Sequence, residues 1–123
     1  MIRQRDDKTG INRRMTPRLV CSLDAFVLPG PLFCTVVDQS ETGLRLSFQR
    51  DFDGWTKLMV VLMASGQAFA AHAKWHKNAE VGVSIISRCD LNGLVPSGFA
   101  EARQVWNRLR RAGDRETGLG RGP

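Results

Sequence analysis

Six short apolar segments, each followed by a turn signal, constrain the fold of this chain more than any other feature. Within one of them, Gly43–Phe48, the apolar residues share one face while Arg45 and Ser47 lie on the other, as expected of a half-buried strand. Pro29-Gly30-Pro31 is a strong turn signal after the first segment. Short strands at this spacing predict a mainly all-β fold, a six-stranded antiparallel β-barrel. The expected strands are residues 19–27, 32–37, 43–48, 57–63, 67–76 and 81–86.

The fifth segment, Gln67–His76, alternates along its length and predicts which side chains are buried. Trp75 falls on the same face as Phe69, so we expect its indole in the core. His72 and His76 fall on the opposite face with Lys74 between them, and no cysteine or carboxylate pattern completes a metal site. A solvated strand face is the favoured interpretation, and no metal is predicted.

A helix is predicted after the last strand, over residues 97–112. Ser97 offers an N-cap, and apolar residues follow at helical spacing. We expect this apolar stripe to dock the helix on the barrel, with Trp106 as its anchor. The stripe consists of Phe99, Ala102, Val105 or Trp106, and Leu109.

The length of the chain fits one small domain. The chain has 123 residues, and we expect a flexible basic arm over 1–10, a folded domain over 11–112 and a disordered tail over 113–123. No apolar run reaches the length of about 20 residues that spans a membrane, so no membrane insertion is expected.

The charged N-terminus does not look like a secretory signal. Three cysteines without a CxxC pattern read as free thiols, which favours a reducing cytoplasm.

Positive charge is concentrated at the two ends of the chain. The net charge is +6, of which residues 1–18 carry +4 and residues 101–123 carry +3, leaving −1 for the middle. Basic ends suit an anionic partner, although a solvated basic surface explains many such runs. A module that binds RNA or single-stranded DNA is one alternative. The net-negative middle and the lack of an evident exposed aromatic platform argue against nucleic acid as the partner.

Two short motifs, at residues 14–18 and 38–43, stand 20 residues apart in the first half of the chain. Arg14 and Arg18 form an RxxxR pattern, with Arg13 as a further candidate, and Asp38-Gln39-Ser40-Glu41-Thr42-Gly43 forms DxSxxG. Guanidinium groups stack on purines and donate in a fork to phosphate or to guanine O6 and N7. A carboxylate such as Asp38 can accept from guanine N1 and N2, or hold an arginine in place. Asp, Ser and Gly are also ordinary turn residues, so the second motif alone indicates no more than a turn.

Taken together, the two motifs resemble the ligand signature of the PilZ domain family over roughly residues 11–112. Arg14 and Arg18 match its arginine motif, and Asp38, Ser40 and Gly43 match the three specified positions of its loop motif. The resemblance implies a six-stranded barrel that binds cyclic di-GMP without converting it. It implies that Arg14 and Arg18 grip phosphates and stack on guanine. Asp38 and Ser40 would read the guanine edge and order the loop, and Gly43 would let the backbone fit.

No pattern of a nucleophile with a general base, of a P-loop or of HExxH is present, so the sequence predicts no enzyme and no cofactor. The function predicted from the sequence is a cytoplasmic, bacterial cyclic di-GMP receptor in second-messenger signalling. In it the ligand orders the arginine arm over the barrel and alters the surface offered to a downstream protein partner. Besides nucleic-acid binding, a PilZ-like protein–protein adaptor that binds no nucleotide is the remaining alternative.

Overall fold

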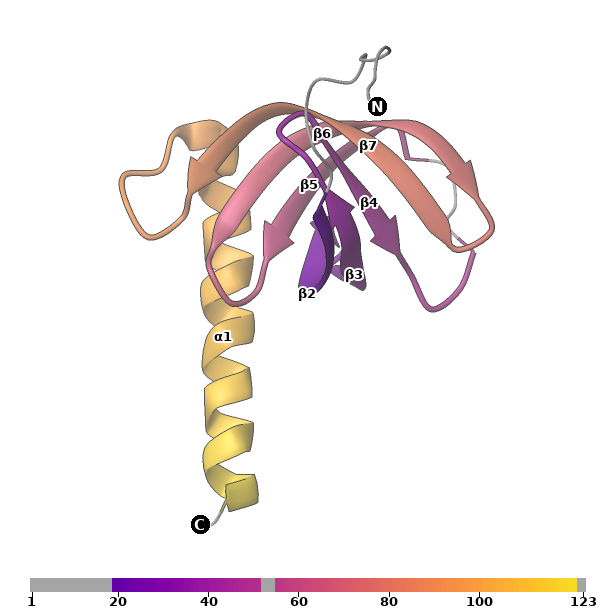
Figure 1. Cartoon of the computed structure of the whole chain (residues 1–123). Helices are drawn as coiled ribbons and strands as arrows, with labels where there is room; N and C mark the ends of the chain where they lie inside the picture. Colours follow the sequence, from indigo (N-terminus) through magenta and orange to yellow (C-terminus); the bar gives the residue numbers. More distant parts are fainter. Residues whose placement is uncertain (1–18, 52–54, 122–123) are drawn as a thin grey trace, which may run out of the picture.

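A closed antiparallel barrel forms the body of the protein, as the sequence predicted. The computed structural model describes residues 19–51 and 55–121, with side chains up to residue 112. Within these residues, six strands close in the order β2-β3-β4-β7-β6-β5, and the helix α1 stands beside the barrel (Figure 1). The elements are β2 (Leu19–Leu28), β3 (Leu32–Gln39), β4 (Gly43–Ser47), β5 (Lys57–Leu62), β6 (Gln67–Lys77), β7 (Glu80–Asp90), a 3-10 turn η1 (Ser97–Phe99) and α1 (Ala100–Arg121).

Turn residues at the strand ends fix the order in which the strands pair. β6 and β7 are joined by a tight turn in which Asn78 adopts a left-handed conformation, with φ 57°. Asparagine tolerates this conformation better than most residues because its short side chain bonds locally. β5 leads into β6 through Gly66, which also has a positive φ, 78°. Each predicted strand is present, and the largest difference in extent is β7, which runs on to Asp90.

The alternation of side chains builds two apolar clusters, one on each side of the sheet. The barrel interior is filled by one face of every strand, for example Val27, Leu46 and Val60, all without solvent exposure. The outer face of β2 and β5 carries Phe26 and Val61, which pack against α1 in the second cluster. A small barrel therefore gains a second apolar layer from its helix, as a chain of this size needs.

Trp106 anchors α1 to the barrel, as the sequence predicted. Its side chain is buried, and its indole Nε1 donates to the Met63 carbonyl at 2.9 Å. The buried stripe also includes Phe99, Ala102 and Val105. The predicted Ser97 cap is not formed, because Ser97 begins η1 and Pro96 takes the capping position without a side-chain hydrogen bond.

The C-terminal boundary of the helix differs from the one predicted. α1 continues to Arg121, past the end expected at residue 112, and projects beyond the barrel (Figure 1). The glycines after residue 112 lower helix propensity by about 1 kcal/mol each but do not forbid a helix. No helix in the described part of the chain is both long and apolar enough to cross a membrane.

Trp75 does not lie in the core, and the prediction of its burial was wrong. The side chain of Trp75 is 46% exposed. The register between β6 and β7 shifts between Ala73 and Trp75, so that Ala73 pairs with Val83 and Trp75 with Gly82. An irregularity of this kind inserts a residue into one strand and turns the following side chain to the other face. The prediction assumed strict alternation along the sequence, and such a pattern gives no sign of the register shift.

Candidate functional site

The fold brings together the three motif residues that the structure describes. Asp38 lies at the end of β3, Ser40 begins the short connection, and Gly43 begins β4. The Ser40 amide donates to the Gly43 carbonyl at 2.9 Å, and the Ser40 hydroxyl oxygen accepts from the Thr42 amide at 3.4 Å. Because the hydroxyl is used as an acceptor, its own hydrogen remains available to donate outward. The turn thus has two hydrogen bonds between its own residues and still presents a donor.

Gly43 is required by the close approach of two strands. It pairs with Ser84 of β7, and a Cβ placed on Gly43 would lie 2.9 Å from the Val83 carbonyl oxygen. Its φ lies outside the positive range, so the constraint is space rather than conformation. A larger residue here would push β4 from β7 and move the loop that precedes it.

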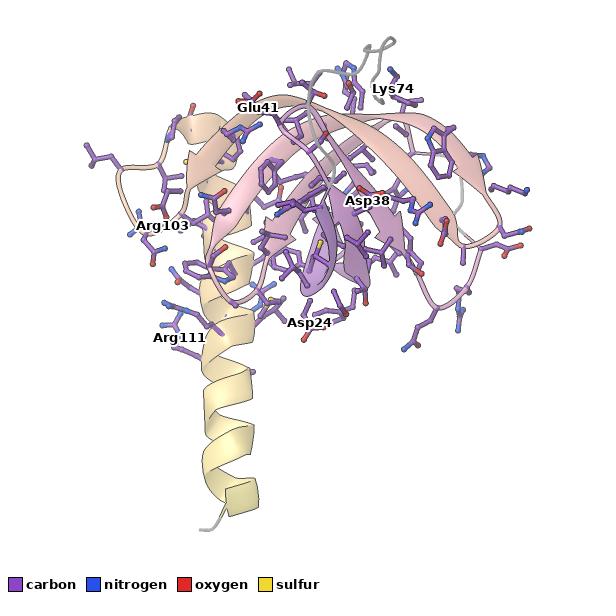
Figure 2. The ribbon with its side chains drawn as sticks, viewed as in Figure 1. Asp24, Asp38, Glu41, Lys74, Arg103 and Arg111 are labelled. Atoms are coloured by element: carbon purple, nitrogen blue, oxygen red, sulfur yellow. The ribbon has the colours of Figure 1, made fainter. Side chains whose placement is uncertain are left out.

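A pocket opens beside this loop on the surface formed by β3, β4, β6 and β7. Its volume is about 310 Å³, and it includes all three described motif residues, Asp38, Ser40 and Gly43. β6 contributes Lys74 and Trp75, which the sequence interpretation had not assigned to the site. Figure 2 labels Asp38 on β3 and Lys74 on β6. A volume near the lower end of the usual range, about 300–1,000 Å³, suits one base or one phosphate group rather than a whole dinucleotide.

The indole of Trp75 lies directly over Gly82 and forms one wall of the pocket. A Cβ built on Gly82 would overlap the indole at Nε1 and Cε2 and come within 2.8 Å of Cζ2. Only a residue without a side chain lets the ring lie this close to the strand. An indole held against a glycine, yet 46% exposed, offers a flat face for a planar ligand. Its signal in the sequence is weak: a Trp and a Gly seven residues apart across a hairpin.

Arg45 supplies a second donor in the same pocket. It pairs with Asp38 of β3 on one side and with Gly82 of β7 on the other. Its guanidinium forms a long ion pair with Glu80, with 3.9 Å between NH1 and Oε1. Its Nε is buried and has no hydrogen-bond partner among the described residues. The Nε is therefore inaccessible to a ligand, and only the half-exposed end of the guanidinium can contribute to the pocket.

The predicted arginines Arg13, Arg14 and Arg18 lie outside the described residues. The described part of the chain begins with β2, directly after Arg18 in the sequence. Leu19 pairs with Gln39 and Val20 pairs with Asp38, so β2 starts directly beside the motif loop. Arg18 is bonded to Leu19, and consecutive Cα atoms are about 3.8 Å apart. The first described residue, Leu19, therefore lies beside the motif loop and lines the cavity that contains Ser40, Glu41 and Arg88.

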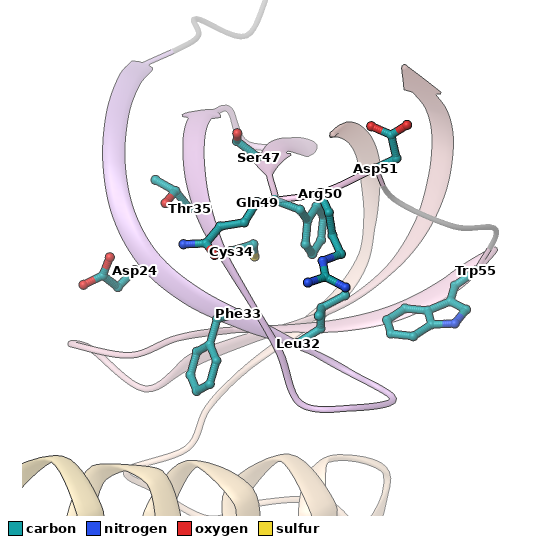
Figure 3. Close-up of a pocket in the computed structure, with 11 residues that line it drawn as sticks. Asp24, Leu32, Phe33, Cys34, Thr35, Ser47, Gln49, Arg50, Asp51 and Trp55 are labelled. Atoms are coloured by element: carbon teal, nitrogen blue, oxygen red, sulfur yellow. The ribbon is translucent and has the colours of Figure 1, made fainter. Parts of the chain in front are cut away.

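A larger cavity lies elsewhere on the barrel and does not include the motif residues. Its volume is about 930 Å³, and Figure 3 shows Asp24 and Asp51 on opposite sides of it, with Arg50 between them. Phe33 and Trp55 contribute apolar surface to its walls. Charges of both signs and exposed apolar groups alternate around it without converging on one point, so no ligand chemistry follows from this cavity.

Two of the cysteines are held in their neutral form. Burial raises the pKa of the Cys34 thiol to about 12. Burial, and then the nearby charge of Asp38, raises the pKa of Cys21. Thiolates are the reactive form, so neither cysteine is a nucleophile near neutral pH.

No protein-family profile, curated protein or solved structure matches this chain. The function must therefore be inferred from the geometry of the pocket and from the motifs around it.

Proposed function

We propose that this chain is a non-enzymatic, cytoplasmic receptor for cyclic di-GMP in bacterial second-messenger signalling, with a PilZ-type site. The observation that carries the proposal is the pocket that joins Asp38 and Ser40 to the exposed indole of Trp75. A carboxylate, a hydroxyl donor and an aromatic face meet in one concave site. These are the groups that recognise a guanine base.

Each group in the pocket has a part in guanine binding. Trp75 stacks on the base, an interaction that contributes about 1–3 kcal/mol in single-stranded nucleic-acid sites. Asp38 accepts from the N1 and N2 donors of guanine, which adenine does not present in that arrangement. Lys74 and Arg45 carry positive charge toward the pocket and favour the phosphates. Ser40 donates its hydroxyl hydrogen to the ligand.

The arginine arm completes the site in this proposal. Arg14 and Arg18, with Arg13 as a further contact, close over the ligand from the start of β2. The positive charges of the arginines balance the two negative charges of the ligand. A pocket of about 310 Å³ does not enclose the whole dinucleotide, so part of the ligand is left for the arm to cover. Binding then changes the surface around β2 and the motif loop, and that change is what a downstream protein partner would read.

Calorimetric titration with Asp38→Asn tests the role assigned to the carboxylate. Asparagine keeps the size of the side chain but cannot accept from both guanine donors. Loss of a charged hydrogen bond of about 1.5–3 kcal/mol predicts affinity for cyclic di-GMP lower by roughly 10- to 150-fold. Asp24→Asn is the matched control, because Asp24 is an exposed strand carboxylate at the other cavity. Equal binding by wild type and Asp38→Asn would contradict the proposed guanine contact.

A second candidate function, binding of RNA or single-stranded DNA, gains support from the same indole. The sequence showed no evident aromatic platform, but Trp75 is exposed and is flanked by Lys74, His76 and Lys77. Aromatic faces interleaved with basic residues are typical of single-strand binding surfaces. Such binding would fall steeply with salt and would accept generic oligonucleotides. Displacement of labelled cyclic di-GMP by unlabelled cyclic di-GMP, but not by an oligonucleotide, excludes it.

A further inference from the structure

The motif loop is held by hydrogen bonds to three of its carbonyls in succession. The Gly43 carbonyl accepts from the Ser40 amide within the loop. The Thr42 carbonyl accepts from the Ile85 amide of β7 at 2.8 Å. The Glu41 carbonyl accepts from the guanidinium of Arg88, a side chain 47 residues away in the sequence. The first two bonds belong to the backbone, whereas the third depends on one exposed side chain.

The side chain of Arg88 also contacts the barrel on its way to the loop. Its guanidinium carbon lies 5.5 Å from the centre of the Phe69 ring, within the range of a cation–π contact. Phe69 is buried in the barrel core, so this anchor is rigid. Arg88 lines a neighbouring cavity, which shares Ser40 with the proposed binding pocket, and it is not among the residues that line the pocket of Asp38 and Trp75. It therefore contacts the loop without lining the binding pocket.

We infer that Arg88 is a positioning residue that holds the 40–43 loop in its binding-competent shape; the inference rests on the proposed function. A guanidinium suits this position because one planar group can lie over the Phe69 ring and donate a hydrogen bond to the Glu41 carbonyl at the same time. Without it, the Glu41 carbonyl would bond to water and the loop would populate more conformations. The apparent affinity then falls in proportion to the fraction of molecules whose loop is competent.

The test compares Arg88→Ala and Arg88→Lys with wild type, and Arg110→Ala serves as the matched control. Arg110 is also an exposed arginine over an aromatic ring, 4.2 Å from the centre of Trp106, but it lies on the helix. We expect Arg88→Ala to weaken cyclic di-GMP binding by about 3- to 10-fold in calorimetry, as for one lost hydrogen bond. Arg88→Lys keeps a donor and should recover part of the affinity, while Arg110→Ala should bind as wild type does.

Hydrogen exchange in the absence of ligand separates positioning from direct contact. If Arg88 holds the loop, Arg88→Ala speeds exchange of the Ser40 amide while the urea midpoint of global unfolding changes little. Unchanged exchange together with weaker binding would mean that Arg88 touches the ligand directly, and would overturn the inference. Equal affinity of wild type and Arg88→Ala would overturn it as well. Failure of wild type to bind cyclic di-GMP at all would instead refute the proposed function, and the exchange result would still report on the loop.

Discussion

Substitution of Gly82 by alanine tests the stacking role of Trp75 without removing the indole. The added Cβ would lie 2.8 Å from Cζ2 of Trp75 and would overlap Nε1 and Cε2. Carbon atoms in contact prefer separations of about 3.5–4.0 Å, so the ring must move by roughly 1 Å or more. The backbone at Gly82 is outside the positive-φ range, and alanine is tolerated there on conformational grounds. The three atoms nearest to the added Cβ all belong to Trp75, so the substitution acts mainly through that side chain.

The expected cost in stability is small, and the expected cost in binding is larger. Because Trp75 is already 46% exposed, it can swing outward, and we estimate a loss of about 0.5–2 kcal/mol in the free energy of unfolding. Loss of one base stack of about 1–3 kcal/mol predicts cyclic di-GMP affinity lower by roughly 5- to 150-fold.

Calorimetry gives the affinity, and urea unfolding gives the stability. Gly98→Ala is the control, since a Cβ at Gly98 meets nothing within 4 Å. In a double-mutant cycle, Trp75→Ala and Gly82→Ala should not add, because both remove the same stacking surface. Wild-type affinity in a folded Gly82→Ala protein would refute the stacking argument. Full additivity of the two losses would refute the assignment of the Gly82 effect to Trp75.

Two further predictions concern the stability of the fold. Gly66→Ala forces a non-glycine residue to φ 78° and places a Cβ 2.6 Å from Cζ2 of the buried Trp106. We therefore expect the free energy of unfolding, measured in urea, to fall by about 2–4 kcal/mol. A fall of less than about 0.5 kcal/mol would contradict the close packing of Gly66 on Trp106. Burial raises the pKa of Cys34 from 9.0 to about 12, so the stabilising effect of its neutral form is complete below pH 9 and is lost as pH rises from 9 toward 12. Cys34→Ala should therefore flatten the fall of stability with pH above 9, and an unchanged slope would show that the thiol ionises as readily in the folded state as in the unfolded one.

The sequence predicted the barrel well because each strand is marked locally, by alternation or by a short apolar run, and is bounded by turn signals. Leu44, Leu46 and Phe48 are buried where the alternation of Gly43–Phe48 places them, and the turn signals mark the strand ends. The anchor Trp106 was also predictable, because helical spacing puts it in line with Phe99 and Ala102.

The candidate site was only partly predictable, since it depends on contacts between strands. The motif marked Asp38, Ser40 and Gly43, but Trp75 reached the pocket through a register shift that alternation does not reveal. Arg88 meets the loop across 47 residues of sequence, through a hydrogen bond that only the closed barrel creates. An irregular register within one hairpin set the position of Trp75, and pairing between segments distant in sequence set that of Arg88; simple alternation carries no information about either.

The central claim is that the pocket beside the motif loop, together with Arg14 and Arg18, binds cyclic di-GMP. Calorimetric titration of the full chain with cyclic di-GMP, beside an Arg14→Ala/Arg18→Ala double variant, tests it most directly. The account predicts saturable binding at micromolar protein by wild type and a loss of at least about 100-fold in the double variant, as for two charged contacts of about 1.5–3 kcal/mol each. No heat from wild type, or equal binding by the two proteins, would contradict it.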